Sequence, residues 1–193
     1  MNRSKKLRFT PKQLAATALA AIGFCSVFAQ AGWFGWDAAK TSTASSFAPS
    51  FALKNLSGAI VHPSDFRGQP VLIDFWASWC SSCKTALPFY QSLYLEHRAQ
   101  GLVVLGVDED NASTTAAQAA KSEGVSYPVL LDPRGKALYA YGVRGLPTAV
   151  LLDRAGRIRG RWFGFNPADA AAMKSKISKL FVEKPWPVGA PRP

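Results

Sequence analysis

Cysteine and histidine are scarce in this chain, and their scarcity excludes several classes of protein. The 193 residues include three cysteines, at positions 25, 80 and 83, and only two histidines. Three cysteines are too few for the disulfide framework that holds small secreted domains together. Because 48% of the residues are hydrophobic, the chain can build a core without such a framework. Cys25 falls in the apolar N-terminal stretch, and we expect the other two, Cys80 and Cys83, to serve chemistry rather than stability.

Acidic residues are absent from the first 31 positions, which open with a basic segment containing Arg3, Lys5, Lys6, Arg8 and Lys12. An apolar, alanine-rich stretch follows over 14–28 and precedes the small residues Ala29-Gln30-Ala31. This order is typical of a secretory signal peptide and predicts cleavage after Ala31, with export to the periplasm. The alternative is an uncleaved membrane tether, for which the apolar stretch is of marginal length.

The chain lacks a basic run with interleaved aromatic residues outside that segment. Nearly half of the net charge of +11 comes from residues 1–31. A nucleic-acid partner is therefore not expected. A local group of arginines remains over 154–161, and its alternation suggests the solvated face of a strand.

The rest of the chain divides into three parts. Residues 32–46 are rich in alanine, serine and threonine and predict a flexible tether, whereas residues 184–193 are proline-rich and predict a disordered tail. Between them, 47–183 predicts one α/β domain, because strand-like and helix-like segments alternate. The expected strands are 51–53, 59–61, 71–75, 102–107, 129–131, 149–152 and 157–163, and the expected helices are 80–99, 113–123, 136–141 and 168–182.

The segment Trp79-Cys80-Ser81-Ser82-Cys83-Lys84 carries the chemistry. It follows the apolar run 71–75 and opens the expected helix 80–99. Two thiols at this spacing can form and break one small disulfide, and a helix N-terminus stabilises a thiolate. The pattern indicates thiol–disulfide exchange, with Cys80 as the nucleophile and Cys83 as the thiol that resolves the mixed disulfide.

Metal and haem sites compete with this interpretation. Zinc usually requires four ligands, and the only histidines, His62 and His97, are distant in sequence, with His97 expected on a helix surface. Covalent haem attachment requires histidine directly after the second cysteine, where Lys84 stands. We expect no metal and no organic cofactor. A binding module for Cu(I) or cytochrome maturation stays open, because a soft ion suits two thiolates.

Asp74 and Trp79 are further candidates for the site. Asp74 lies inside the apolar strand, where a carboxylate is costly unless it has a task or a partner. We expect burial to raise its pKa and to let it exchange protons with Cys83. The alternative is a carboxylate at a strand end that reaches a backbone or lysine partner. Trp79 is expected to be partly exposed and to line a docking surface, whereas Trp76 is expected in the core.

The segment from Phe75 to Lys84, the in-helix Pro88 and the pair Pro147-Thr148 resemble the thioredoxin superfamily. Within it the chain is most similar to exported oxidoreductases of the TlpA/ResA/CcmG type. The resemblance implies a thioredoxin-like three-layer α/β/α sandwich with a mixed central sheet and an N-terminal β-hairpin extension. It also implies a cis Leu146–Pro147 bond beside the disulfide, with Leu146 and Thr148 contributing to substrate docking.

The resemblance further implies a periplasmic enzyme that reduces disulfides in exported proteins, as in cytochrome c maturation, and a membrane electron donor of the DsbD or CcdA type. Two features depart from the family pattern. Ala86 stands where many relatives have glutamate, which leaves proton transfer to Asp74, and Ser81-Ser82 replaces a dipeptide that usually contains proline. A disulfide oxidase or isomerase on the same fold is the alternative, and the redox potential of the cysteine pair discriminates between them.

Overall fold

The computed structural model describes residues 46–183. The expected signal peptide, the expected tail 184–193 and the expected tether, apart from Ser46, lie outside the described residues. No helix within the described range is both long enough and apolar enough to cross a bilayer.

A seven-stranded mixed sheet forms the centre of the described part, in the order β2-β1-β5-β4-β3-β6-β7. Strands β3, β4 and β5 run parallel, whereas β6 is antiparallel to β3 and β7 is antiparallel to β6. The hairpin β1–β2 extends the sheet beyond β5. The strands are β1 Leu53–Asn55, β2 Ile60–Val61, β3 Val71–Trp76, β4 Val103–Asp108, β5 Val129–Leu131, β6 Thr148–Leu152 and β7 Ile158–Phe163.

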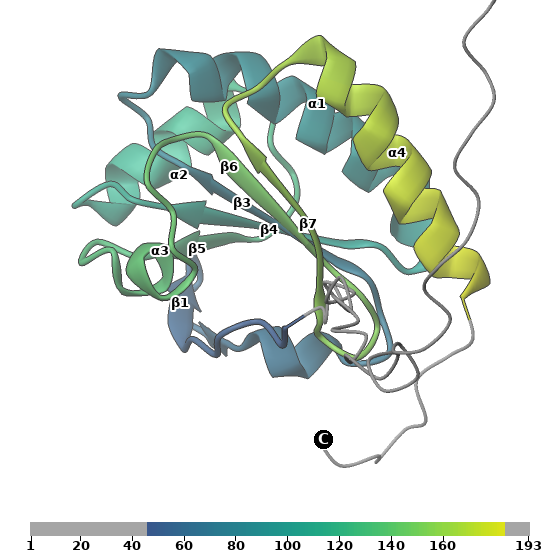
Figure 1. The fold of residues 1–193 in the computed structure, drawn as a ribbon. Helices are drawn as coiled ribbons and strands as arrows, with labels where there is room; N and C mark the ends of the chain where they lie inside the picture. The colour runs from purple at the N-terminus through teal and green to yellow at the C-terminus, as the bar shows by residue number, and fades with distance from the viewer. Residues whose placement is uncertain (1–45, 184–193) are drawn as a thin grey trace, which may run out of the picture. The chain divides into compact units, whose positions relative to one another are not determined.

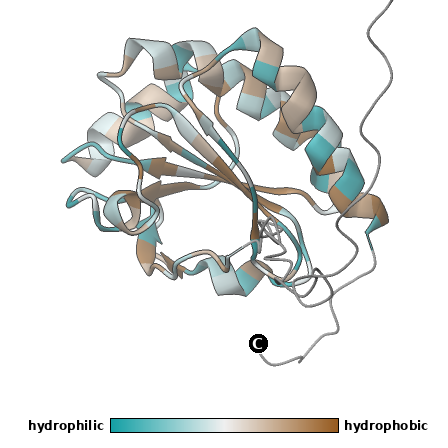
Figure 2. Cartoon of the chain, viewed as in Figure 1, coloured by the Kyte–Doolittle hydropathy of each residue, from teal (hydrophilic) through white to brown (hydrophobic). Residues whose placement is uncertain are grey.

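Helices cover both faces of this sheet (Figure 1). On one face lie α1 (Ser81–His97), α2 (Ser113–Ser122) and α4 (Pro167–Val182), and on the other lies the short α3 (Lys136–Ala140). The expected three-layer α/β/α sandwich with an N-terminal β-hairpin extension is therefore confirmed. The hydrophobic residues concentrate along the central strands (Figure 2).

Alternation along β3 separates two cores, because successive strand residues point to opposite faces. Leu72 and Trp76 pack with residues of α1, α2 and α4 in what we call the α1-side core. Val71, Ile73 and Phe75 pack with Ala137 and Tyr141 in the α3-side core. Asp74 has the parity of Leu72 and Trp76, so β3 directs its carboxyl toward the face covered by α1.

Two sequence interpretations of surface residues are wrong. His97 is buried at 7% exposure, because its ring lies 5.7 Å from the ring of Phe181 of α4. The arginines over 154–161 are not a plain solvated face. Arg157 and Arg159 pair with the buried Asp153, and Arg159 also pairs with Glu183, which links β7 to the end of α4.

Candidate active site at the start of helix α1

The two cysteines lie where β3 gives way to α1. Cys80 is the N-cap residue of α1, and its Sγ accepts a hydrogen bond from the backbone N–H of Cys83 at 3.2 Å. The two sulfur atoms form a disulfide with a length of 2.07 Å. The chain therefore holds the pair at a helix N-terminus, as the sequence predicted. Unpaired N–H groups and the helix dipole stabilise negative charge at this position.

Burial distinguishes the two sulfur-bearing residues. Cys80 retains 7% exposure, whereas Cys83 is fully buried in the α1-side core. The Oγ of the exposed Ser82 lies 3.4 Å from Cys80 Sγ, within hydrogen-bonding range for sulfur. A thiolate on Cys80 would therefore have both a backbone N–H and a hydroxyl beside it. This asymmetry makes Cys80 the thiol that a partner disulfide can reach.

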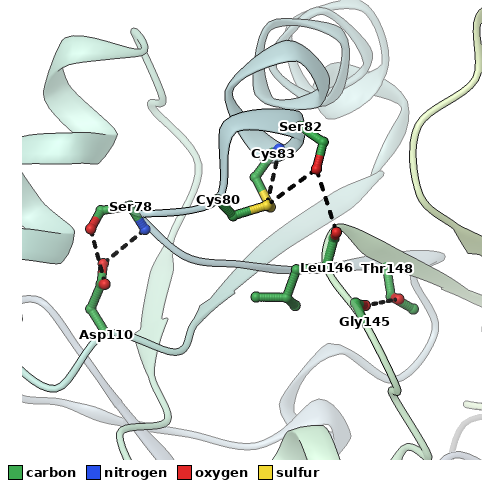
Figure 3. The surroundings of a disulfide bond; sticks show 8 residues. All are labelled: Ser78, Cys80, Ser82, Cys83, Asp110, Gly145, Leu146 and Thr148. Atoms are coloured by element: carbon green, nitrogen blue, oxygen red, sulfur yellow. Dashed lines mark hydrogen bonds between the residues drawn. A yellow bond between two sulfur atoms is a disulfide. The ribbon is translucent and has the colours of Figure 1, made fainter.

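The loop before β6 faces the disulfide from the side opposite to Ser78 (Figure 3). The Leu146–Pro147 bond in this loop is cis, as the family resemblance implied. Ser82 Oγ donates to the Leu146 carbonyl at 3.5 Å, which brings the loop next to the cysteine pair. Leu146 is half-buried and packs against both the α1-side and the α3-side cores.

The other expected docking residues differ in accessibility. Trp79 is 70% exposed, beside the disulfide in sequence, and offers a large apolar surface. Thr148 is fully buried, and its hydroxyl donates to the Gly145 carbonyl at 2.7 Å (Figure 3). Its side chain is therefore held inside the fold and bonded to the loop that carries Leu146.

Asp74 is a buried acid on the α1-facing side of β3. Its burial raises its pKa from 3.8 to about 8, although a hydrogen bond from the Tyr127 hydroxyl opposes that rise. The Tyr127 hydroxyl donates to Oδ2 at 3.4 Å, and Oδ1 has no partner among the described residues. At neutral pH the carboxyl is therefore mainly protonated and can lend or take up a proton. Ala86 is fully buried in α1 and has no ionisable group.

Gly106 makes space for this arrangement. It lies opposite Asp74 in the β3–β4 register. A Cβ at Gly106 would come within 3.0 Å of both Trp76 Nε1 and Tyr127 Cε2. The missing side chain therefore lets the indole and the phenol ring close over β4. Neither Gly106 nor Tyr127 was identified from the sequence, although a glycine inside an apolar strand is a signal of close approach.

A second group of acidic residues lies near the loop that precedes Cys80, and one of them, Asp110, holds this loop through hydrogen bonds. The Asp110 carboxylate accepts hydrogen bonds from the Ser78 backbone N–H at 3.0 Å and from its hydroxyl at 2.9 Å. Burial, with neighbouring acids adding to it, raises the pKa of Asp108 to about 7 and that of Glu109 to about 8. The sequence analysis assigned no role to this acidic run. Its place directly after a buried strand was the available signal.

Within residues 46–183, no group of three or more histidine, cysteine or carboxylate side chains is arranged to hold a metal ion. The site combines a disulfide at the N-terminus of α1, a buried acid on the α1-facing side of β3 and the loop that contains the cis Leu146–Pro147 bond. This combination suits the exchange of one disulfide for another.

Comparisons with known proteins agree with this chemistry. The sequence profile of the AhpC/TSA family matches residues 45–161. The thiol-disulfide oxidoreductase ResA of Geobacillus thermodenitrificans is 34% identical over 121 residues, which cover 62% of this chain and 70% of that protein. ResA of Bacillus subtilis is 33% identical over 111 residues, covering 58% of this chain and 62% of that protein, so the match spans less than two thirds of its length.

A solved structure extends the likeness. A Chlorobium tepidum protein assigned as the thiol:disulfide interchange protein DsbE aligns with a TM-score of 0.68 and 34% identity, covering 71% of this chain and 96% of that one. The fold, the cysteine pair and these relatives lead to one conclusion. The chain belongs to the AhpC/TSA family and is a thioredoxin-like thiol–disulfide oxidoreductase of the ResA and DsbE type.

Proposed function

We propose that this enzyme works in the periplasm as a reductase of disulfides in other exported proteins, apocytochrome c among them. The observation that carries the proposal is the asymmetry of the pair, in which Cys80 is reachable at the N-terminus of α1 and Cys83 is buried behind it. A reductase needs such a pair, because one thiol must meet the substrate while the other waits within reach.

The reaction proceeds in two exchanges. The Cys80 thiolate attacks one sulfur of a substrate disulfide, which forms a mixed disulfide and releases the other substrate sulfur as a thiolate. The Cys83 thiolate then attacks Cys80 Sγ, which forms the Cys80–Cys83 disulfide and releases the second substrate thiolate. Two electrons pass to the substrate, and the protons that complete its thiols come from solvent or from the site.

The remaining site residues support these steps. Asp74 accepts the proton that Cys83 must lose before it can attack, and it does so from the fraction of molecules in which its carboxyl is ionised, because its pKa of about 8 keeps that fraction populated near neutral pH. Pro147 and Leu146 form the loop against which a substrate polypeptide lies, and Trp79 extends that surface. Thr148 positions the loop through its hydrogen bond to Gly145.

Each turnover leaves the enzyme as the disulfide, which is the state in the structure. A dithiol donor must therefore return two electrons, and we assign this role to a membrane protein of the DsbD or CcdA type. The signal peptide expected over 1–31 supports export, and the names of the ResA and DsbE relatives support the reaction. Cleavage would release the domain, and an uncleaved signal would tether it to the membrane.

The reduction potential of the Cys80–Cys83 pair in the domain 47–183 tests the direction of electron flow. We expect a value near or below that of thioredoxin, about −270 mV, measured by equilibration with glutathione or dithiothreitol. A value near that of DsbA, about −120 mV, would replace the reductase by an oxidase or isomerase.

Trapping identifies the substrates. We expect Cys83→Ser to accumulate mixed disulfides through Cys80 with exported proteins, because the resolving thiol is gone. These adducts are measured by non-reducing electrophoresis and mass spectrometry of the periplasmic fraction. Cys80→Ser is the matched control, and equal adduct levels in the two variants would contradict the assignment of Cys80 as the nucleophile.

A further inference from the structure

A groove of about 780 Å³ opens beside the loop that carries Leu146. One wall is the segment after α3, including Arg144, Gly145 and Leu146, and the other is the end of β7, including Arg161 and Phe163. Neither the disulfide chemistry nor the packing of the fold accounts for these arginine and phenylalanine side chains.

The groove adjoins the surface through which a substrate would reach Cys80 Sγ. Ser82 Oγ lies 3.4 Å from Cys80 Sγ and 3.5 Å from the carbonyl oxygen of Leu146, which is itself a wall residue. Figure 3 shows this connection from Cys80 through Ser82 to the loop. A polypeptide joined to Cys80 would therefore continue past Leu146 toward the groove.

The groove carries positive charge that the described residues do not neutralise. Arg157 and Arg159 on the same strand pair with Asp153, but neither Arg144 nor Arg161 has a carboxylate partner within residues 46–183. The Arg161 guanidinium donates to the Tyr141 carbonyl at 2.6 Å. This bond fixes Arg161 against the groove wall and leaves its remaining N–H groups available.

Apolar surface lies beside these charges. Phe163 is 63% exposed at the end of β7, and Leu146 is half-buried across from it. Exposed aromatic residues and arginines are enriched where proteins bind other proteins, because they combine a large contact area with directed hydrogen bonds. The groove therefore suits an extended polypeptide that presents both an apolar and an acidic side chain.

We propose that this groove is a specificity subsite for an acidic side chain of the substrate polypeptide, located a few residues from the cysteine that Cys80 attacks. The carboxylate binds between Arg144 and Arg161, and an adjoining apolar side chain covers Phe163 and Leu146. The proposal rests on the proposed function of the cysteine pair and names the chemistry of the substrates that this pair prefers.

Two synthetic peptides test the subsite. Each holds one disulfide, and they differ only by glutamate or glutamine near the cysteine. We expect the reduced enzyme to favour the glutamate peptide in kcat/KM by about tenfold at low salt, with the ratio falling as salt is added.

Arg144→Ala should bring the ratio of the two kcat/KM values close to one, and Arg144→Glu should invert it. Arg144 is exposed and has no hydrogen bond from its side chain within the described range, so these variants are expected to fold.

Arg98→Ala is the matched control, because it removes an exposed arginine just beyond the C-terminal end of α1, away from Cys80. Its peptide ratio should equal that of the wild type. Equal rates for the two peptides with the wild-type enzyme would overturn the subsite. The neutral compound 2-hydroxyethyl disulfide distinguishes a failure of the subsite from a failure of the proposed function. A reduced enzyme that does not reduce this compound would contradict the proposed reductase activity itself.

Discussion

Asp74 is a carboxylic acid in a place that water does not reach, and its protonation state follows from that position. Hydration stabilises the ionised form of a carboxyl, so burial favours the neutral form. The phenols nearby are also kept neutral, since burial and the proximity of Asp74 raise the pKa of both Tyr90 and Tyr127. Asp74, Tyr90 and Tyr127 are thus all mainly neutral at pH 7.

This proton makes stability depend on pH. The folded chain holds the Asp74 proton up to about pH 8, whereas the unfolded chain loses it near pH 3.8. The free energy of unfolding therefore falls as pH rises between these values, by up to about 1.4 kcal/mol per pH unit for this group. We expect Asp74→Asn to remove this loss, so that its stability relative to the wild type grows from pH 4 to pH 8 in urea unfolding.

Tyr127→Phe is the matched control, because it retains the acid and removes the hydrogen bond that lowers the Asp74 pKa. Its pH-dependent region should extend to higher pH than in the wild type. A constant difference between Asp74→Asn and the wild type across this pH range would mean that Asp74 is ionised in the folded protein.

At the scale of elements, β4 makes room for the side chains that surround Asp74. We expect Gly106→Ala to destabilise the fold by about 1–3 kcal/mol, because a Cβ would meet Trp76 and Tyr127 at 3.0 Å. Chemical denaturation measures the loss. Gly145→Ala is the control, since a Cβ there meets nothing within 4 Å. Equal free energies of unfolding for the two variants would show that the Trp76 and Tyr127 rings move aside without cost.

The loop between β3 and α1 is held in place by hydrogen bonds to Asp110. Asp110→Asn weakens the two hydrogen bonds from Ser78, of which one comes from the backbone. We expect a loss of about 1–3 kcal/mol in the free energy of unfolding and a changed pKa of the Cys80 thiol in the reduced enzyme. Ser92→Ala, which removes an exposed hydroxyl bonded within α1, is the control. An unaltered Cys80 pKa would limit Asp110 to a structural role.

The elements themselves were largely predictable from the sequence. The apolar run of β3 and the cysteine pair located the strand–helix junction, and Cys80 caps α1 as that junction requires. The expected helix 168–182 begins one residue earlier, at Pro167, because Asn166 caps it. Local patterns of this kind depend on neighbours in the chain, which the sequence displays directly.

The contacts between distant segments were not predictable in the same way. Tyr127 meets Asp74 across 53 positions of sequence, and Asp110 meets Ser78 across 32. His97 was expected on a surface because the helix that covers it, α4, comes much later in the chain. Register and helix docking decide such contacts, and neither follows from the periodicity of one segment.

For the whole molecule, the signal peptide predicted over residues 1–31 bears on which form of the chain acts. We expect the exported protein to begin within one or two residues of Gly32, because the segment before it has the order of a signal peptide. N-terminal sequencing and intact mass of the periplasmic protein measure this. Ala31→Phe, which replaces the small residue at the cleavage site, should retain the segment. A wild-type protein that keeps Met1 in the membrane fraction would instead support the tether.

Leu146 packs against both cores and stands at the mouth of the active site. The magnetic environment of its methyl groups therefore depends on each half of the domain and on whatever occupies the loop. Isotopic labelling of this one leucine would provide a spectroscopic reporter inside the enzyme. The same pair of methyl resonances would shift when the cysteines are oxidised, when a polypeptide binds, or when the packing of either core weakens. The Leu146 methyl groups could therefore follow the whole catalytic cycle in solution.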